Sequence, residues 1–299
     1  MIKQCLHNLS FFGLIFLALF PEAEYAQNRS VTIKGSDTMV LLGQRWAELY
    51  MKKVPESRIQ VTGGGSGTGI AALINGTTDI CESSRPITQR ERQAIRQKWG
   101  KDPVEIAVAI DGLAIYLHPS NSVDELSLSQ LKGIYTGAVS NWKQVGGQDL
   151  RIVMYGRENN SGTYAFFKEH VLENQDFHPR TQTLPGTAAV VNAVSKDVKA
   201  IGYGGIAYSK GIKLVRVKST DTGPSLIPSM ENVLSGKYPV SRSLFWYFAG
   251  DPSGEAKSLT DWVLSPEGQA IVKEVGYYPL PRKGVVKNAG TSAPGGQQK

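Results

Sequence analysis

The sequence predicts an α/β fold, because apolar segments of strand length alternate with segments of helical periodicity. The chain has 299 residues, which is long for one hydrophobic core and comfortable for two lobes. Its two cysteines are Cys5 and Cys81, and only Cys81 follows the leader described below. No disulfide can then form within the mature chain, so its stability has to come from buried cores, and we expect Cys81 to be a small buried residue.

The first 117 residues alternate between the two kinds of segment. Apolar residues recur at helical spacing after Thr38, with Ser36 or Asp37 as the expected N-cap. Thr88 and Glu91 have the spacing of a capping box. The pattern predicts strands at 31–34, 58–62, from 80 onward, 104–110 and 112–117, and helices at 38–54, 70–75 and 88–99.

The alternation continues to the C-terminal end and favours largely parallel sheets. One long helical pattern closes the folded part, and a Gly-, Lys-, Gln- and Ser-rich tail from about 283 is expected to be disordered. The pattern predicts strands at 152–155, 201–203 and 245–248, and helices at 128–135, 163–173, 187–195 and 258–275.

The first 26 residues have the features of a secretory signal. Lys3 gives a positive start, residues 10–20 form a short apolar run, and residues 23–26 fit a small-x-small cleavage pattern. We therefore expect cleavage near Ala26 and a periplasmic or secreted, extracytoplasmic protein. The alternative is an uncleaved membrane anchor, although the run is short for a membrane span.

The formal net charge of the whole chain is +7, and the basic residues are scattered rather than clustered. A nucleic-acid groove would need Lys and Arg runs with interleaved aromatic residues, so we expect no nucleic-acid partner. A mild attraction for small anions is the better interpretation. The four histidines show no metal-ligand spacing, and we expect no metal and no other cofactor.

Three short loops place glycine and hydroxyl residues where helices are expected to begin, at 35–38, 63–69 and 157–163. Helix N-termini offer unpaired N–H groups and partial positive charge, and glycine lets the backbone approach a ligand. Together the loops indicate a pocket for a small oxyanion, with Arg157 as a charged donor. Two of these loops also have a simpler interpretation. Their hydroxyl and carboxyl residues could be no more than helix caps, and Arg157 could be a surface ion-pair partner of Glu158. The possible caps are Ser36, Asp37 and Thr38 in the first loop and Ser161 and Thr163 in the third.

These residues give the chain a resemblance to a known family. The Arg157-x-x-x-Ser161-Gly162-Thr163 segment, residues 131–137 and Asn141-Trp142 resemble the substrate-binding proteins of the high-affinity phosphate ABC transporter, which are class II periplasmic binding proteins. The resemblance implies two α/β lobes joined by two hinge strands, with phosphate held in the cleft between them. Lobe 1 would be 27–110 plus 244–299, and lobe 2 would be 111–243.

The resemblance also implies which residues hold the phosphate. In the best-known members an aspartate at the end of the third strand accepts a hydrogen bond from the protonated phosphate, but here that position is Ser84. Asp37 could supply the missing acceptor and Arg85 an added cation. The change leaves sulfate or another tetrahedral oxyanion open as the ligand. The expected phosphate-binding residues are Ser36, Asp37, Thr38, Ser66, Gly67, Ser84, Arg85, Arg157, Ser161, Gly162 and Thr163.

Other function classes fit the sequence less well. Residues 67–72 match a loose dinucleotide-binding pattern, but no acidic residue closes a second strand where a ribose would need it. A secreted phosphatase with Ser66 or Ser161 as nucleophile would need a metal pair or a base beside the serine, and an adhesion or signalling module on the same scaffold remains an alternative. We therefore expect no catalytic residue and a monomeric receptor that delivers inorganic phosphate to an ABC permease and its ATPase.

Overall fold

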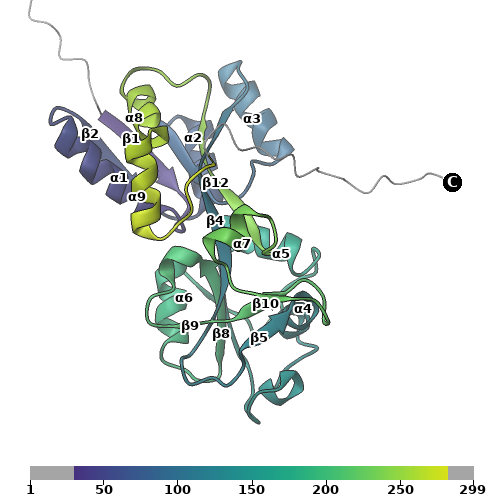
Figure 1. Ribbon diagram of the computed structural model, residues 1–299. Helices are drawn as coiled ribbons and strands as arrows, with labels where there is room; N and C mark the ends of the chain where they lie inside the picture. Colours follow the sequence, from purple (N-terminus) through teal and green to yellow (C-terminus); the bar gives the residue numbers. More distant parts are fainter. Residues whose placement is uncertain (1–29, 282–299) are drawn as a thin grey trace, which may run out of the picture.

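A computed structural model describes residues 30–281. Figure 1 shows two groups of helices and strands, one above the other, connected by the long strand β4 and by β12. We call the group that contains the first strands lobe 1 and the other group lobe 2. The leader expected at residues 1–26 and the tail expected from about 283 lie outside the described residues. Both lobes contain helices and strands, as the predicted α/β class requires.

One sheet runs through both lobes. Its strand order is β2-β1-β3-β12-β4-β8-β6-β7, and β9 pairs with β4 at the side of this path. Neighbours β1, β2 and β3 are parallel, as are β6, β7 and β8, whereas β12 and β4 run antiparallel to their neighbours. The prediction of largely parallel sheets therefore holds within each lobe and fails at the crossing strands. The strands are β1 (Ser30–Gly35), β2 (Arg58–Thr62), β3 (Ile80–Ser83), β4 (Val104–Leu117), β6 (Val153–Arg157), β7 (Gln182–Leu184), β8 (Ala200–Gly205), β9 (Lys213–Leu214) and β12 (Ser241–Phe248).

Strand β4 is the element that carries the sheet from lobe to lobe. The sequence predicts two short strands here, but the structure has one strand of 14 residues. Its first part pairs with β12 up to Gly112, and its last part pairs with β8 from Leu113 onward. The expected lobe boundaries at 110/111 and 243/244 stay a prediction, and both fall on these two strands.

Within residues 30–281, lobe 1 carries five helices around its part of the sheet. The predicted helix at 258–275 is wrong as a single element, because the chain breaks at Ser265, which ends one helix and caps the next. Pro266 explains the break, since proline lacks the N–H that a continuous helix needs and suits a first helical turn. The helices are α1 (Val40–Lys53), α2 (Ser66–Asn75), α3 (Gln89–Trp99), α8 (Gly254–Leu264) and α9 (Pro266–Val275).

The predicted caps have mixed outcomes. The Thr88–Glu91 capping box of α3 is confirmed in both directions. The predicted cap of α1 is wrong, because α1 begins at Val40 and the side chain of its N-cap residue, Met39, makes no capping hydrogen bond within the described chain. Asp37 instead accepts a hydrogen bond from the backbone N–H of Gly64 at 2.9 Å. The first amides of α1 are therefore left without a side-chain cap.

Lobe 2 adds a small second sheet that the sequence did not predict. Its order is β11-β10-β5, and β5 and β10 are parallel. Helices cover both sheets of the lobe, with α5 beginning directly after the Arg157 loop. The elements are β5 (Glu125–Ser127), β10 (Arg216–Lys218), β11 (Ser225–Leu226), α4 (Leu128–Thr136), α5 (Gly162–His170), α6 (Gly186–Val194), α7 (Met230–Leu234) and the short helices η1 (Trp142–Val145) and η2 (Ile206–Tyr208).

Large aromatic side chains pack within both cores. In lobe 1, Trp46 of α1 meets Trp246 of β12 edge to face at 5.5 Å between ring centroids. In lobe 2, Phe167 of α5 stacks on Tyr203 of β8 at 4.0 Å. Cys81 is buried, as the sequence predicts, and burial raises the pKa of its thiol. Rings of this size supply much of the apolar area that holds each lobe together.

The lobe 1 core also contains a carboxyl group, Glu82 of β3, with no exposed surface. Its Oε1 accepts a hydrogen bond from Trp246 at 3.2 Å, and its Oε2 has no hydrogen-bond partner among residues 30–281. A Cβ on Gly43 of α1 would lie 2.5 Å from Oε1, so the helix packs directly on this group. Burial raises the pKa of Glu82 to about 8, although the Trp246 hydrogen bond opposes the shift.

This carboxyl should make the stability of the protein depend on pH. Because the folded pKa of about 8 lies above the unfolded value, folding retains a proton that unfolding releases. The contribution of Glu82 to the free energy of unfolding is fully present below about pH 4.5. It falls as the pH rises toward 8, by about 1.4 kcal/mol per pH unit. We expect Glu82→Gln to remove that slope, measured by urea unfolding at pH 5, 6.5 and 8.

Glu267→Gln is the matched control for this experiment. Glu267 is about half exposed and pairs with Lys53, which lowers the pKa of its carboxyl. The contribution of Glu267 to the free energy of unfolding should therefore change only below about pH 4.5. A Glu82→Gln variant with the same pH slope as the unaltered protein would contradict the burial argument.

Candidate functional site

The three predicted loops meet between the lobes, at the N-terminal ends of α1, α2 and α5. The hydroxyls of Thr38, before α1, and Thr163, in the first turn of α5, lie 2.9 Å apart. The Oγ of Ser66, the first residue of α2, accepts a hydrogen bond from the backbone N–H of Ser84 and lies 3.4 Å from the Ser84 Oγ. All four side chains are buried. We call the site formed by these four side chains and the residues that contact them the hydroxyl cluster.

Gly162 brings α5 against the lobe 1 side of the hydroxyl cluster. A Cβ at Gly162 would lie 2.3 Å from the Ser66 Oγ and 2.7 Å from the Ser84 Oγ. Both distances are shorter than any non-bonded contact of a real side chain, so only glycine fits here. The backbone N–H groups at the start of α5 therefore lie beside the two serine hydroxyls.

The glycine-rich loop before α2 docks on the loop before α5. The Gly67 N–H donates to the Asn160 carbonyl at 2.9 Å, and the Asn160 side chain donates to the Gly64 carbonyl and the Thr68 hydroxyl. Gly65 has a φ of +91°, and a Cβ there would meet the Asn160 carbonyl at 2.8 Å. The contact thus needs glycine, both for its backbone conformation and for the close approach.

Arg157, the last residue of β6, is a buried cation at this junction, with a relative exposure of 1%. Its Nη2 donates to Asp37 of lobe 1 at 2.6 Å, its Nη1 to Thr187 at 3.1 Å and its Nε to Glu158 at 3.3 Å. Glu158, the alternative partner expected for Arg157, therefore does pair with it, but it is one of three side chains that accept hydrogen bonds from the guanidinium. Of five guanidinium hydrogens, two are not donated to any residue in the described range.

Ser161 serves as the N-cap of α5, which is the simpler of the two predicted interpretations. Its Oγ accepts from the backbone N–H groups of Thr163 and Tyr164 at 3.2 and 3.3 Å. A hydroxyl has two acceptor lone pairs and one hydrogen, so a cap of this kind still leaves the hydrogen for a ligand. The capping role and a role as donor are therefore compatible.

Two tyrosines fix the turn that carries Asp37 and Thr38. The Tyr208 hydroxyl, from η2, donates to the Asp37 carbonyl at 2.7 Å, and the Tyr277 hydroxyl donates to the Thr38 carbonyl at 2.6 Å. Burial raises the pKa of both phenols, and the Asp37 carboxylate adds to the rise at Tyr208. Both therefore stay protonated donors in ordinary buffers.

The structure brings most of the predicted site residues together and separates one of them. The guanidinium of Arg85 makes two hydrogen bonds to Glu91 of α3, at 2.6 and 2.9 Å, and one to the Pro86 carbonyl. Burial alone would raise the pKa of Glu91, but the Arg85 partner holds it below its usual range. Arg85 therefore belongs to a structural ion pair. The residues that gather at the junction are Ser36, Asp37, Thr38, Ser66, Gly67, Ser84, Arg157, Ser161, Gly162 and Thr163.

Two buried charged residues of the cluster were missed by the sequence analysis. Arg242 of β12 and Asp111 of β4 form an ion pair of 2.9 Å, and Arg242 also donates to the hydroxyl of Thr163. The available signal was a charged residue within each of two largely apolar strands, where burial requires a partner. The loop patterns could not reveal them, because neither residue lies in a loop.

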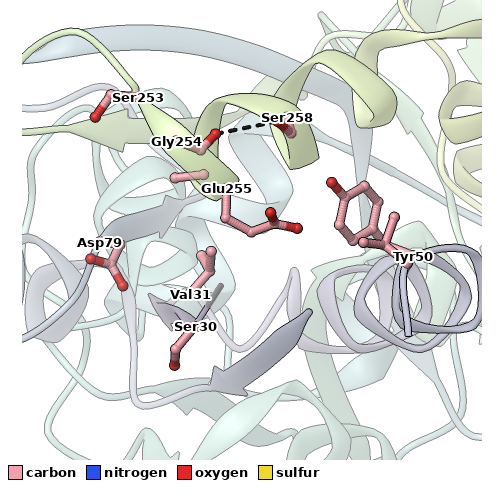
Figure 2. Close-up of a pocket in the computed structure, with 10 residues that line it drawn as sticks. Ser30, Val31, Tyr50, Asp79, Ser253, Gly254, Glu255 and Ser258 are labelled. Carbon is pink, nitrogen blue, oxygen red and sulfur yellow. Dashed lines mark hydrogen bonds between the residues drawn. The ribbon is translucent and has the colours of Figure 1, made fainter. Parts of the chain in front are cut away.

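A separate pocket in lobe 1 has the wrong charge for an anion. It has a volume of about 470 Å³ and is lined by residues of β1, α1 and the start of α8, including Tyr50, Asp79 and Glu255. Figure 2 shows the Asp79 and Glu255 carboxylates on its walls, with the hydroxyl of Ser258 bonded to the Gly254 carbonyl. Carboxylates without an arginine or lysine in the lining would repel an anion, so this pocket is not the predicted site.

Among residues 30–281, no group of three or more His, Cys, Asp or Glu side chains lies close enough to hold a metal ion. Over the same range, no helix has the length and apolar character to cross a membrane.

Comparisons with known proteins agree with this geometry. A family model described as a PBP superfamily domain matches residues 21–267. The "Phosphate-binding protein PstS" of Pseudomonas aeruginosa is 35% identical over 283 residues, covering 88% of this chain and 87% of the relative. The protein of the same name from Bacillus subtilis is 32% identical over 270 residues, covering 90% of this chain and 86% of that relative.

Solved structures of proteins named for phosphate transport are also similar to this chain. A crystal structure of a phosphate ABC transporter substrate-binding protein from Clostridium perfringens, with bound phosphate, has a TM-score of 0.77 at 32% identity. It covers 84% of this chain and 100% of its own. A phosphate transport receptor from Vibrio cholerae has a TM-score of 0.67 at 29% identity, with the same two coverages. This chain belongs to the periplasmic-binding-protein superfamily and, within it, to the family of substrate-binding proteins of phosphate ABC transporters.

Proposed function

We propose that the protein binds inorganic phosphate between its lobes and delivers it to an ABC-type permease for import. The observation that carries the proposal is the meeting of three helix N-termini at the hydroxyl cluster, with Arg157 buried beside it. Each N-terminus contributes N–H groups and about half a positive charge. The names of the relatives support phosphate in particular.

The donor set suits a tetrahedral oxyanion. The hydroxyls of Thr38, Ser66, Ser161 and Thr163 can each donate one hydrogen, and Arg157 retains two hydrogens that no described residue accepts. Charge-assisted bonds from a guanidinium are shorter and roughly twice as strong as neutral ones. In this proposal, phosphate inserts between the lobes, and the hydroxyls that now contact one another turn toward its oxygens.

We further propose that Asp37 discriminates phosphate from sulfate. Phosphate carries a proton near neutral pH and sulfate does not, so a carboxylate beside the anion favours phosphate. Asp37 lies at the junction and binds Arg157 and the Gly64 N–H. Placing an unprotonated anion against this carboxylate would cost on the order of 1–3 kcal/mol or more. Sulfate is therefore the alternative ligand that the site should reject.

The remaining features of the proposal concern partners and location. The protein would act as a monomeric, extracytoplasmic receptor, after cleavage near Ala26, and would dock on a permease and ATPase complex. It would release phosphate unchanged, because a serine nucleophile needs an adjacent base or metal, whereas Ser66 and Ser161 have backbone amides and another hydroxyl as neighbours. The family membership supports this receptor role.

Calorimetry on the mature protein tests the function directly. After unfolding and refolding to remove any retained ligand, we expect phosphate to bind with one site per chain and sulfate to bind at least tenfold more weakly. A phosphomonoester with and without added divalent metal should release no phosphate above background. Absence of phosphate binding would overturn the receptor role, and metal-dependent turnover would support the phosphatase alternative.

A further inference from the structure

The ion pair of Arg242 and Asp111 lies on the two strands that connect the lobes. The two residues are directly opposite each other in the β12–β4 pairing. Asp111 has no exposed surface and Arg242 is 6% exposed. The Asp111 Oδ2 accepts from the Nε and Nη2 of Arg242 at 3.0 and 2.9 Å, and its Oδ1 accepts from the Ile206 N–H. The carboxylate therefore fixes the guanidinium in one orientation.

The other hydrogen bonds of Arg242 reach both lobes. Its Nη1 donates to the Ser84 carbonyl at 3.0 Å, on the lobe 1 side, and its Nη2 donates to the Thr163 hydroxyl at 2.9 Å, on the lobe 2 side. The guanidinium carbon lies 5.3 Å from the centroid of the Phe166 ring. A single side chain at the crossing thus bonds to the two sides of the hydroxyl cluster.

Arg242 and Arg157 differ in how many of their guanidinium hydrogens are already donated within the protein. Both Nη2 hydrogens of Arg242 are used, by Asp111 and Thr163, and the Nε and one Nη1 hydrogen are used as well. Four of its five hydrogens are therefore committed within the protein. Arg157 commits three and keeps one on each terminal nitrogen. Arg242 cannot present a two-pronged donor to an anion, so its effect on the ligand has to pass through a neighbour.

That neighbour is Thr163. A guanidinium can only donate, so the bond from Arg242 occupies a lone pair of the Thr163 Oγ1 and directs the hydroxyl hydrogen elsewhere. The Thr38 hydroxyl lies 2.9 Å from the Thr163 Oγ1. The hydrogen of Thr163 is thereby aimed into the cluster, where a bound anion would accept it. A fixed donor loses less rotational freedom on binding than a free one.

We propose that Arg242, held by Asp111, is a positioning residue that orients the Thr163 hydroxyl toward the bound anion and joins the two sides of the site across the connecting strands. The proposal rests on the proposed function, since it assumes that phosphate binds at the hydroxyl cluster. Because the pair is neutral in sum, the effect is one of donor geometry and not of added positive charge.

A double-mutant cycle between Arg242 and Thr163 tests the inference. Arg242→Lys retains the charge beside Asp111, but one ammonium group cannot reach Asp111, Ser84 and Thr163 with the spacing of a guanidinium. We expect it to weaken phosphate binding at least tenfold in calorimetry. In a Thr163→Val background, which has no hydroxyl to orient, the same substitution should change the dissociation constant less than threefold.

The outcomes distinguish this inference from the proposed function. If the unaltered protein binds no phosphate, both fail. If it binds phosphate and Arg242→Lys binds equally well, or loses the same factor in both backgrounds, only the positioning role is overturned. Thr163→Ser, which retains the hydroxyl, should keep the sensitivity to Arg242→Lys. Should Arg242→Lys not fold, the charge-free pair Asp111→Asn with Arg242→Gln replaces it in the same cycle with the same expected and contradicting results.

Discussion

An Arg157→Ala variant should bind phosphate at least a hundredfold more weakly than the unaltered protein. The substitution removes a buried guanidinium that links lobe 2 to Asp37 of lobe 1 at 2.6 Å. It also removes the two hydrogens that we assign to the anion, and hydrogen bonds to charged groups contribute about 1.5–3 kcal/mol each. A hundredfold loss corresponds to about 2.7 kcal/mol. Calorimetric titration with phosphate measures the change.

Arg85→Ala is the matched control, because sequence reasoning placed both arginines in the site. The structure commits Arg85 to Glu91, so its loss should leave the dissociation constant within about twofold. Asp37→Asn tests the partner of Arg157, and we expect it to narrow the ratio between phosphate and sulfate affinities. Equal losses for Arg157→Ala and Arg85→Ala would show that only general charge matters and would remove the assigned role of Arg157.

The contrast between these arginines illustrates how far the sequence could locate the site. Glycine and hydroxyl residues before a helix constrain the backbone locally, so the loops at 35–38, 63–69 and 157–163 could be recognised from neighbouring residues alone. Which way a long side chain points is decided by tertiary partners. Arg85 turns to Glu91 because that carboxylate, already fixed by the Thr88 cap, offers two oxygens.

The fold shows the same division between local and tertiary information. Local signals placed α1 to α6 and most strands of the larger sheet, but they missed β5, β7, β9, β10, β11 and α7. The α3 capping box is as predicted. The joining of the two predicted strands into β4 could not be foreseen, because the charged Asp111 between two apolar runs indicates a break. In the folded chain Asp111 finds Arg242 on the neighbouring strand, and that pairing makes a continuous buried strand possible.

The closeness of the two lobes is also a tertiary property, and Gly162 is one of the glycines that permit it. Gly162 begins α5 directly against the Ser66 and Ser84 hydroxyls. Ser66 cannot easily yield, because its Oγ accepts the Ser84 N–H and its backbone begins α2. Any side chain at position 162 would therefore separate the lobes at the place where they enclose the anion.

Gly162→Ala should accordingly weaken phosphate binding by about a hundredfold while leaving the protein at least as stable. Alanine is a better helix residue than glycine by roughly 0.5–1 kcal/mol, so thermal unfolding of the ligand-free variant should not fall. Its Cβ would need to lie 2.3 Å from the Ser66 Oγ in the closed arrangement, and this clash opposes closure. Calorimetry should show the lost affinity, and small-angle scattering should show a smaller phosphate-induced contraction.

Gly133→Ala provides the control, since Gly133 is also helical, in α4 of the same lobe. A Cβ there would meet only a methyl group of Val139, at 3.0 Å, far from the contact between the lobes. We expect its phosphate affinity to match that of the unaltered protein. If Gly162→Ala also bound phosphate normally, the anion would have to be held without the direct approach of α5 to Ser66 and Ser84. Because loss of affinity without loss of stability is the expected signature, a variant that simply unfolds would not be mistaken for one that cannot close.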